Sequence, residues 1–301
     1  MMLYDLPAPA KLNLFLHVVG RRADGYHWLE SLFRLISLSD AVTIDLRTDG
    51  VISREPCSAV TWSEADDLAV RAAKALQQAT GTRTGAHIAI RKRIPTGGGL
   101  GGGSSDAATV LLGLNRLWRT GLTREELMVL GLPLGADVPF FLFGQSALVT
   151  GIGERFQPVT ISERSYVVAQ PNVSVPTPTI FAAADLTRDS EPVKISDFSG
   201  LNRVKTRFTG IGAFGRNDLE PVVKRLFPVV DTAQQWLASH GVLSRLTGSG
   251  ACLFSEFTDP NEAVFANEQL LAKMQSSQCG LKTVHACDGL PVHPLQNWAV
   301  D

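Results

Sequence analysis

The sequence lacks an excess of charge of either sign, a long apolar run and any close pairing of cysteines. Its 28 basic residues face 29 acidic ones, so the formal net charge is −1. A balance this even gives no reason to expect a nucleic acid or an anionic membrane as partner. No stretch approaches the roughly 20 apolar residues that a membrane span needs. We therefore expect small molecules, rather than nucleic acid or membrane, to be the partners of this chain.

The cysteines and the start of the chain both favour a cytoplasmic protein. Only four cysteines occur in 301 residues, and none has the close spacing of a metal-binding pair. In a chain of this size they are expected to be reduced thiols rather than a disulfide framework. Near the start, Asp5 and two prolines stand where a secretion signal would have a basic and then an apolar stretch. The cysteines are Cys57, Cys252, Cys279 and Cys287.

Residues 10–18 alternate between two kinds of side chain. Four aliphatic residues from Leu12 to Val18 share one face, and Lys11, Asn13, Phe15 and His17 share the other. Period-two alternation predicts a strand with one apolar face and one face that carries polar groups. Further strands are predicted at Trp28–Ile36, Ala41–Leu46 and His87–Ile94, and helices over Asp66–Ala79, Ser104–Leu117 and Thr123–Leu130, the last with a capping box of Thr123 and Glu126.

The second half is less regular. Prolines predict an extended stretch up to Thr177, and residues 186–210 are typical of a polar surface segment. Strands and helices mixed in this order favour an α+β architecture with a boundary near residue 158, which gives domains of residues 1–158 and 159–301. Helices are predicted near 219–226, 231–240 and 261–276, and strands near 243–247, 251–257 and 281–286.

The most informative segment is a glycine run, with six glycines in the seven positions 97–103. Glycines are costly in backbone entropy and supply no core, but without Cβ atoms several N–H groups can approach one anion. The run leads into a predicted helix, whose first N–H groups and dipole also favour negative charge. Ser104 and Ser105 would add hydroxyl donors at the first turn. The segment therefore predicts a polyphosphate site.

Three other interpretations of this segment fit less well. A flexible linker would not be followed at once by an amphipathic helix. A Walker loop needs Gly-Lys-Ser or Gly-Lys-Thr, which is missing here. Gly97, Gly99 and Gly102 match a dinucleotide fingerprint, but the strand before them ends in Arg-Lys-Arg-Ile-Pro and no second βα unit with an acidic strand end follows. The loop is a phosphate loop of another kind.

With two other segments, the loop resembles the motifs of the GHMP kinase family. These segments are Pro-Ala-Lys-Leu-Asn-Leu at 9–14 and Leu-Thr-Gly-Ser-Gly-Ala-Cys at 246–252. The resemblance implies a two-domain α+β fold with the active site in the cleft between the domains, ATP as co-substrate and Mg²⁺. The residues that match the family's ATP loop are Pro95, Gly97, Gly98, Gly99, Leu100, Gly101, Gly102, Gly103, Ser104 and Ser105.

Further segments, at 24–27, 134–140, 176–181 and 217–220, resemble family members that act on a cytidine-bearing alcohol of isoprenoid precursor synthesis. The resemblance implies transfer of the γ-phosphate of ATP to the 2-hydroxyl of a methylerythritol that carries cytidine diphosphate. One alternative is a kinase for another alcohol, such as homoserine or mevalonate, which has no base to stack. Another is a nucleotide-binding module without catalysis, which would be expected to lack a catalytic pair.

The catalytic pair is expected to be Lys11 and Asp137. A kinase must align the acceptor hydroxyl and accept its proton. From the residues alone, Asp137 before Val-Pro-Phe-Phe could equally be a helix N-cap, and Lys11 a solvated charge. The resemblance implies that Asp137 is the catalytic aspartate and Lys11 the active-site lysine. Such an ammonium would keep the carboxylate ionised and polarise the hydroxyl.

The cytidine would need a flat slot with hydrogen-bonding groups at its side. Tyr26 and Phe181 could stack on the base, a contact of about 1–3 kcal/mol in nucleic-acid systems, and His27 could bind its edge. The residues alone also allow Phe181 to be core and Tyr26 to be turn packing. The resemblance implies that Tyr26, His27, Thr177 and Phe181 form the cytidine pocket and that Asn13 lies close to the substrate.

One position departs from the family pattern. Asp67 precedes Leu68 where family members more usually have Asn-Leu near the adenine. No adenine contact is therefore carried over to this chain. The sequence also names no protein ligand for Mg²⁺, an ion that often keeps its waters and binds mainly through substrate phosphates.

Overall fold

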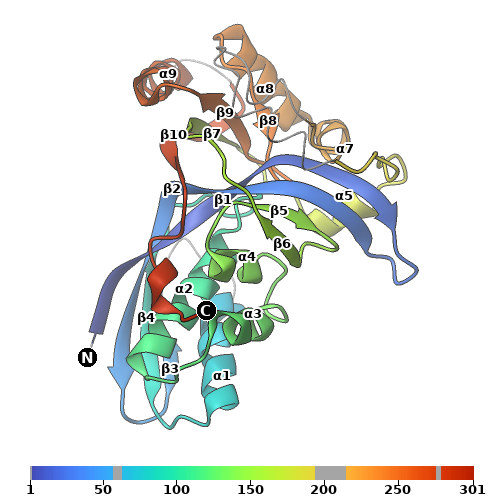
Figure 1. Cartoon of the computed structure of the whole chain (residues 1–301). Helices are drawn as coiled ribbons and strands as arrows, with labels where there is room; N and C mark the ends of the chain where they lie inside the picture. Colours follow the sequence, from blue (N-terminus) through green and yellow to red (C-terminus); the bar gives the residue numbers. More distant parts are fainter. Residues whose placement is uncertain (1, 57–62, 194–214, 276–278) are drawn as a thin grey trace.

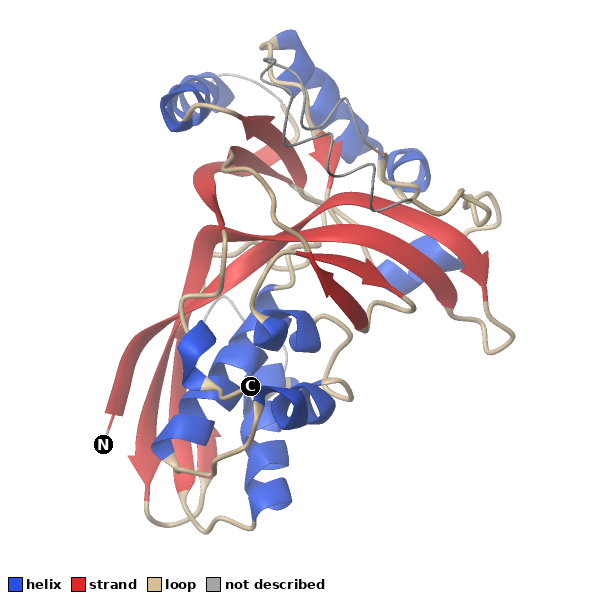
Figure 2. Cartoon of the chain, viewed as in Figure 1, coloured by secondary structure: helices blue, strands red, loops and turns tan. Residues whose placement is uncertain are grey.

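The computed structural model describes residues 2–56, 63–193, 215–275 and 279–301 (Figure 1). Cys57 and residues 194–210 of the predicted surface segment lie outside these ranges. The fold is α+β, as predicted, with helices gathered on two sides of a long pair of strands (Figure 2). None of the helices in the described residues is long and apolar enough to cross a membrane. The described cysteines, Cys252, Cys279 and Cys287, are buried free thiols.

The long pair consists of β1 (Met2–Arg21) and β2 (His27–Arg47), which run antiparallel from Met2 opposite Asp45 to Arg21 opposite His27. The prediction of two separate strands within β2 is wrong. Ser37, Ser39 and Asp40 resemble a break in the sequence, but Ser39 and Asp40 are paired with β1, and Ser37 lies at a shift of register within the same strand. Asp40 is tolerated in the strand, although it is buried, because its carboxylate accepts hydrogen bonds from the backbone of Arg93 and Ile94.

The polar side chains of β1 are buried rather than exposed to solvent. Lys11, Asn13 and His17 are as buried as the aliphatic side chains between them. The strand lies between the two halves of the molecule, so both of its faces are covered. Its polar side chains are held by partners inside the protein rather than by water.

In the first half, α1 (Leu68–Thr80) and α2 (Gly102–Leu117) pack together and α3 (Arg124–Gly131) lies beside them. The predicted end of α1 is confirmed, because Gly81 follows it with a φ of 67°. The capping box of Thr123 and Glu126 is confirmed as well. The remaining elements of this half are η1 (Glu64–Asp66), α4 (Val138–Phe143), β3 (Ile52–Arg54), β4 (Gly85–Arg91), β5 (Ala147–Thr150) and β6 (Arg155–Pro158).

In the second half, a sheet of β7 (Ser165–Pro171), β9 (Leu253–Phe257) and β10 (Leu281–Leu290) packs against α9 (Pro260–Met274). The three predicted helices of this half are present. The expected extended stretch ends in a short helix, α5 (Thr177–Ala182), which was not predicted from the sequence. The other elements are α7 (Glu220–Leu226), α8 (Pro228–Ser239), β8 (Arg245–Leu246) and η2 (Gln296–Trp298).

Strand β2 connects the two halves. It pairs with β4 and β5 of the first half and, through Leu35 and Ile36, with the end of β10. One hydrophobic cluster lies under α1 to α4, and another lies among the helices of the second half. The halves therefore meet along β1 and β2, and this junction positions the site described next (Figure 1).

Candidate active site

The glycine loop lies flat against the segment before β9. Gly97, Gly99 and Gly101 have φ values of 68°, 76° and 71°, a region that glycine adopts without strain. At Gly98 a Cβ would stand 2.4 Å from Cys252 Sγ, and at Gly99 it would stand 2.3 Å from the carbonyl oxygen of Thr247. The glycines thus serve two needs, left-handed backbone and close approach of two chain segments.

Hydrogen bonds fix this loop on both sides while its own N–H groups stay free. Leu100 O accepts from Lys11 N at 3.0 Å, and Gly98 O accepts from Cys252 N at 3.1 Å. Within the described residues, none of the N–H groups from Gly97 to Ser104 donates a hydrogen bond. The loop is therefore held by its carbonyls and presents a row of N–H donors at the start of α2, as an anion site requires.

The two serines after the glycines differ. Ser104 lines the cavity beside the loop. Ser105 is fully buried: its hydroxyl donates to Pro9 O at 2.6 Å and its N–H donates to Gly101 O. The expectation that Ser105 offers a free hydroxyl donor is wrong, because this group anchors α2 to β1. Leu100 likewise packs its side chain into the core, so only its backbone is available to a ligand of the loop.

Lys11 and Asp137 meet across the cavity, with 3.5 Å between Lys11 Nζ and Asp137 Oδ2. The Lys11 side chain is 5% exposed, and its Nζ also donates to Asn13 Oδ1 at 2.6 Å and lies 4.6 Å from the centre of the Phe33 ring. Asp137 occupies the N-cap position of α4, but its side chain makes no capping hydrogen bond. Its carboxylate is instead 32% exposed and faces the lysine.

The pair lies in a cavity of about 760 Å³ that both halves of the chain line. Its walls include the glycine loop, the 24–27 turn and α5. A smaller hollow of about 220 Å³ lies on the other side of the loop, and both share Gly99, Gly101 and Ser104. This arrangement can hold a polyphosphate along the loop, with the rest of the nucleotide in one hollow and the phosphate acceptor in the other. The predicted site residues that line the larger cavity are Lys11, Asn13, Tyr26, His27, Gly99, Gly101, Ser104, Asp137, Thr177 and Phe181.

The comparisons with known proteins agree with this geometry. A family model described as GHMP kinases N terminal domain matches residues 67–145, and one described as GHMP kinases C terminal matches residues 198–276. A Bordetella pertussis protein named 4-diphosphocytidyl-2-C-methyl-D-erythritol kinase is 54% identical, and the match covers 99% of each chain. The chain belongs to the GHMP kinase family.

Three further proteins are similar to this GHMP kinase. A protein of the same name from Aromatoleum aromaticum is 48% identical over 98% of this chain and 96% of that protein. A crystal structure of 4-(cytidine 5'-diphospho)-2C-methyl-D-erythritol kinase is 34% identical, with a TM-score of 0.77 over 96% of this chain and 99% of that one. Homoserine kinase from Cytophaga hutchinsonii, at 15% identity and a TM-score of 0.67 over 97% and 95% of the two chains, shares the fold.

In this GHMP kinase Tyr26, His27 and Phe181 line one part of the cavity, here called its aromatic end. The ring centres of His27 and Phe181 are 5.3 Å apart, and their planes differ by 31°. Tyr26 is 63% exposed, whereas His27 is buried. Thr177, at the start of α5, shares a 2.6 Å hydrogen bond with the hydroxyl of Ser249. Phe181 packs partly on the core of the second half and also lines the cavity. It can therefore be a core residue and a stacking surface at the same time.

Hydrogen bonds and packing hold the residues of the site in place. Asn13 is not free to turn, because its amide donates to Ser31 Oγ at 2.9 Å while its oxygen accepts from Lys11. Asn217 holds the segment against which the loop lies by donating to Leu246 O and Gly248 O. The motif 217–220 signalled Asn217. Nothing local signalled Ser31 or Phe33, which reach the lysine only through the register of β1 and β2.

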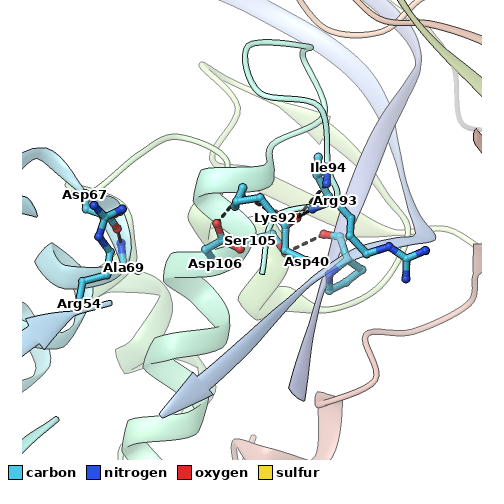
Figure 3. Close-up of polar contacts among 10 residues, drawn as sticks. Asp40, Arg54, Asp67, Ala69, Lys92, Arg93, Ile94, Ser105 and Asp106 are labelled. Carbon is cyan, nitrogen blue, oxygen red and sulfur yellow. Dashed lines mark hydrogen bonds and ion pairs between the residues drawn. The ribbon is translucent and has the colours of Figure 1, made fainter. Parts of the chain in front are cut away.

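A buried charged cluster lies under the start of α2 (Figure 3). Lys92 Nζ lies 2.5 Å from Asp40 Oδ2 and 2.6 Å from Asp106 Oδ2. Burial, together with the nearby Asp40, raises the pKa of Asp106 to about 7 against the opposing effect of Lys92. Its other oxygen, Oδ1, has no hydrogen-bond partner among the described residues. The cluster ties β2, the strand before the loop and α2 together.

The departure at Asp67 has a local structural role (Figure 3). Its carboxylate caps α1 by accepting from Ala69 N at 2.9 Å. It also pairs with Arg54 Nη1 at 2.8 Å, and both side chains are nearly buried. An aspartate at this position is thus held by its own charge partner.

Proposed function

We propose that this GHMP kinase transfers the γ-phosphate of ATP to the 2-hydroxyl of 4-diphosphocytidyl-2-C-methyl-D-erythritol, in the non-mevalonate synthesis of isoprenoid precursors. The observation that carries the proposal is that the Lys11–Asp137 pair, the glycine loop and the residues of the aromatic end line one cavity. The names of relatives at 54% and 48% identity support the same substrate. Homoserine and mevalonate have no base, so they would leave the aromatic end of the cavity unused.

In the proposed step, the substrate oxygen attacks the γ-phosphorus, its proton passes to Asp137 and ADP leaves. Lys11, whose Nζ lies 3.5 Å from Asp137 Oδ2, stabilises charge on the reacting oxygens. Asn13 and Phe33 hold the ammonium in place, so that little reorganisation is needed at the moment of transfer. The free N–H groups of the loop bind the phosphates.

Membership of the family implies ATP as co-substrate, and we propose that Mg²⁺ accompanies it. Mg²⁺ usually keeps several waters and binds through substrate phosphates and one or two protein oxygens. The described residues contain no cluster of three acidic, histidine or cysteine side chains, which fits an ion bound mainly through ATP. Ser104 and Asp137 are two of the oxygen-bearing side chains that line the cavity, and they could complete its coordination.

We also propose that residues 1–158 form the ATP-binding unit and residues 159–301 the second unit. The two main hydrophobic clusters largely follow this division. Leu16 and Val18 join the second cluster, and Leu295 and Ala299 join the first, so each unit lends residues to the other. A cytoplasmic location is proposed as well, because ATP is the co-substrate and the described cysteines are free thiols.

The test of the function is ADP release with a panel of acceptors. We expect turnover with 4-diphosphocytidyl-2-C-methyl-D-erythritol and far less with homoserine, mevalonate or galactose. Asp137→Asn should bind ATP nearly as well but should lower kcat by at least about a hundredfold, because the proton acceptor is lost. Equal rates with another acceptor would refute the substrate, and full turnover of Asp137→Asn would refute the base.

The aromatic pocket has its own test. Phe181→Ala should raise the KM for the cytidine substrate by about tenfold, because stacking on one base is worth about 1–3 kcal/mol. The KM for ATP should stay within about twofold. Phe265→Ala is the matched control, since Phe265 is an exposed phenylalanine on α9 that does not line the cavity. An unchanged KM in Phe181→Ala would remove the pocket from the proposal.

A further inference from the structure

Arg188, which follows α5, makes contacts at the aromatic end of the cavity that the proposed step does not use. Its Nε donates to His27 Nε2 at 3.1 Å. Its two other nitrogens donate to four backbone carbonyls of the chain around the end of α5, with Ala183 O at 2.6 Å and Leu186 O at 3.0 Å as the shortest contacts. The guanidinium thus holds the segment that bears Phe181 and, at the same time, one nitrogen of His27.

This contact decides where the proton of His27 lies. A guanidinium has five N–H donors and no acceptor, so the ring nitrogen that faces Arg188 must offer a lone pair. In the neutral imidazole the proton is then on Nδ1. Among the described residues Nδ1 has no hydrogen-bond partner, and His27 lines the cavity. The ring therefore offers one N–H donor to a ligand.

The surroundings also keep the ring neutral. Burial, and after it the positive charges of Arg188 and Arg21, lower the pKa of His27. The two carboxylates nearest in the chain each have another partner: Asp24 is paired with Arg22 at 2.7 Å, and Glu30 accepts from Val193 N at 2.7 Å. A protonated His27 would direct a second N–H at Arg188, whose groups can only donate.

We propose that Arg188 fixes the tautomer of His27 and thereby makes this pocket select cytosine over uracil. The proposal rests on the function proposed above and deepens it. The two pyrimidines differ at position 4, an amino group in cytosine and a carbonyl in uracil, and at N3, an acceptor in cytosine and an N–H donor in uracil; the proposal places His27 Nδ1 opposite N3. A base on Phe181 lies within reach of His27, whose ring centre is 5.3 Å from that of Phe181. An Nδ1–H donor there matches cytosine and opposes uracil. Arg188 is a positioning residue, since it acts on the base through His27.

The kinetic test compares the cytidine substrate with its uridine analogue. The native enzyme should favour cytidine in kcat/KM, and Arg188→Gln should reduce that preference by about tenfold or more, because a glutamine can donate or accept and so permits both tautomers. Arg188→Lys should retain most of the preference, since an ammonium can only donate. Arg225→Gln is the matched control, because Arg225 pairs with Asp185 of the same segment and does not contact His27.

An unchanged preference in Arg188→Gln, or an equal rise of KM for both substrates, would overturn the proposal. The tautomer is measured separately from the ¹⁵N shifts of the six histidines, with His27 assigned by its loss in His27→Gln. The native enzyme should show the proton on Nδ1, and a proton on Nε2 would also overturn the proposal.

Binding of CDP and UDP by calorimetry gives a readout that needs no turnover. CDP should bind about tenfold or more tightly than UDP in the native protein, and this ratio should fall in Arg188→Gln. If neither methylerythritol substrate is phosphorylated, the proposed function fails, while the ¹⁵N shifts and this ratio still decide the role of Arg188.

Discussion

Two carboxylates share one lysine under the start of α2, and this local charge imbalance has a measurable consequence. Asp106 is almost fully buried, one of its oxygens has no partner, and its pKa is raised to about 7 from an ordinary 3.8. Between about pH 4 and pH 7 the native state therefore holds a proton that the unfolded chain has released. The contribution of Asp106 to the free energy of unfolding therefore falls as the pH rises through this window and levels off above it.

Asp106→Asn removes this titration. Relative to the native protein, the variant should gain stability as the pH is raised from 4.5 to 8, by on the order of a few kcal/mol at most. Urea unfolding across this range measures the difference. Glu268→Gln on α9 is the control, because it neutralises an exposed carboxylate, and its difference from the native protein should stay constant. A constant difference for Asp106→Asn as well would show that Asp106 is ionised throughout.

Single residues also show which parts of the site could be predicted from the sequence and which could not. Lys11 and Asp137 were predicted as a pair because each lies in a recognisable motif, and the structure brings them within 3.5 Å. Phe33, which lies against the ammonium, belongs to no such motif. Its position depends on pairing between β1 and β2, and a shift of one residue would turn it to the opposite face. Arg188 was not predicted either, because its partner His27 is 161 residues away in the chain.

At the scale of elements, long periodic segments were predicted well and short or interrupted ones were not. Helices α1 and α3 have clear caps and were found nearly to the residue. Helices α4 and α5 have six residues each, too few for a 3.6-residue period to be recognised, so α4 was indicated only by the N-cap interpretation of Asp137 and α5 was not predicted. A proline in the first turn of both was the available signal. Strand β2 was divided because polar residues in mid-strand resemble a turn unless their buried partners are known.

At the scale of the whole molecule, residues 291–301, here called the strap, return from β10 to the first half. His293 N donates to Gly144 O at 2.7 Å, at the end of α4. Arg124, at the start of α3, donates to Leu142 O at 2.7 Å and also to Gln296 O, Ala299 O and Asp301. One buried guanidinium thus joins α4 to the strap. Because Asp137 is at the other end of this six-residue helix, the strap supports the Lys11–Asp137 pair.

Arg124→Lys should therefore impair catalysis as well as stability. A lysine cannot reach all of these acceptors, and each buried carbonyl left without a donor costs about 1–3 kcal/mol. We expect the Tm to fall by about 5 °C. We also expect kcat to fall by about tenfold, with both KM values within about twofold, since Asp137 shifts while the binding surfaces remain.

Arg116→Lys is the control: Arg116 lies over the Trp298 ring of the strap, at 4.8 Å, without touching α4. It should leave kcat unchanged. A lower Tm with unchanged kcat in Arg124→Lys would mean that the strap only stabilises the fold and does not position Asp137.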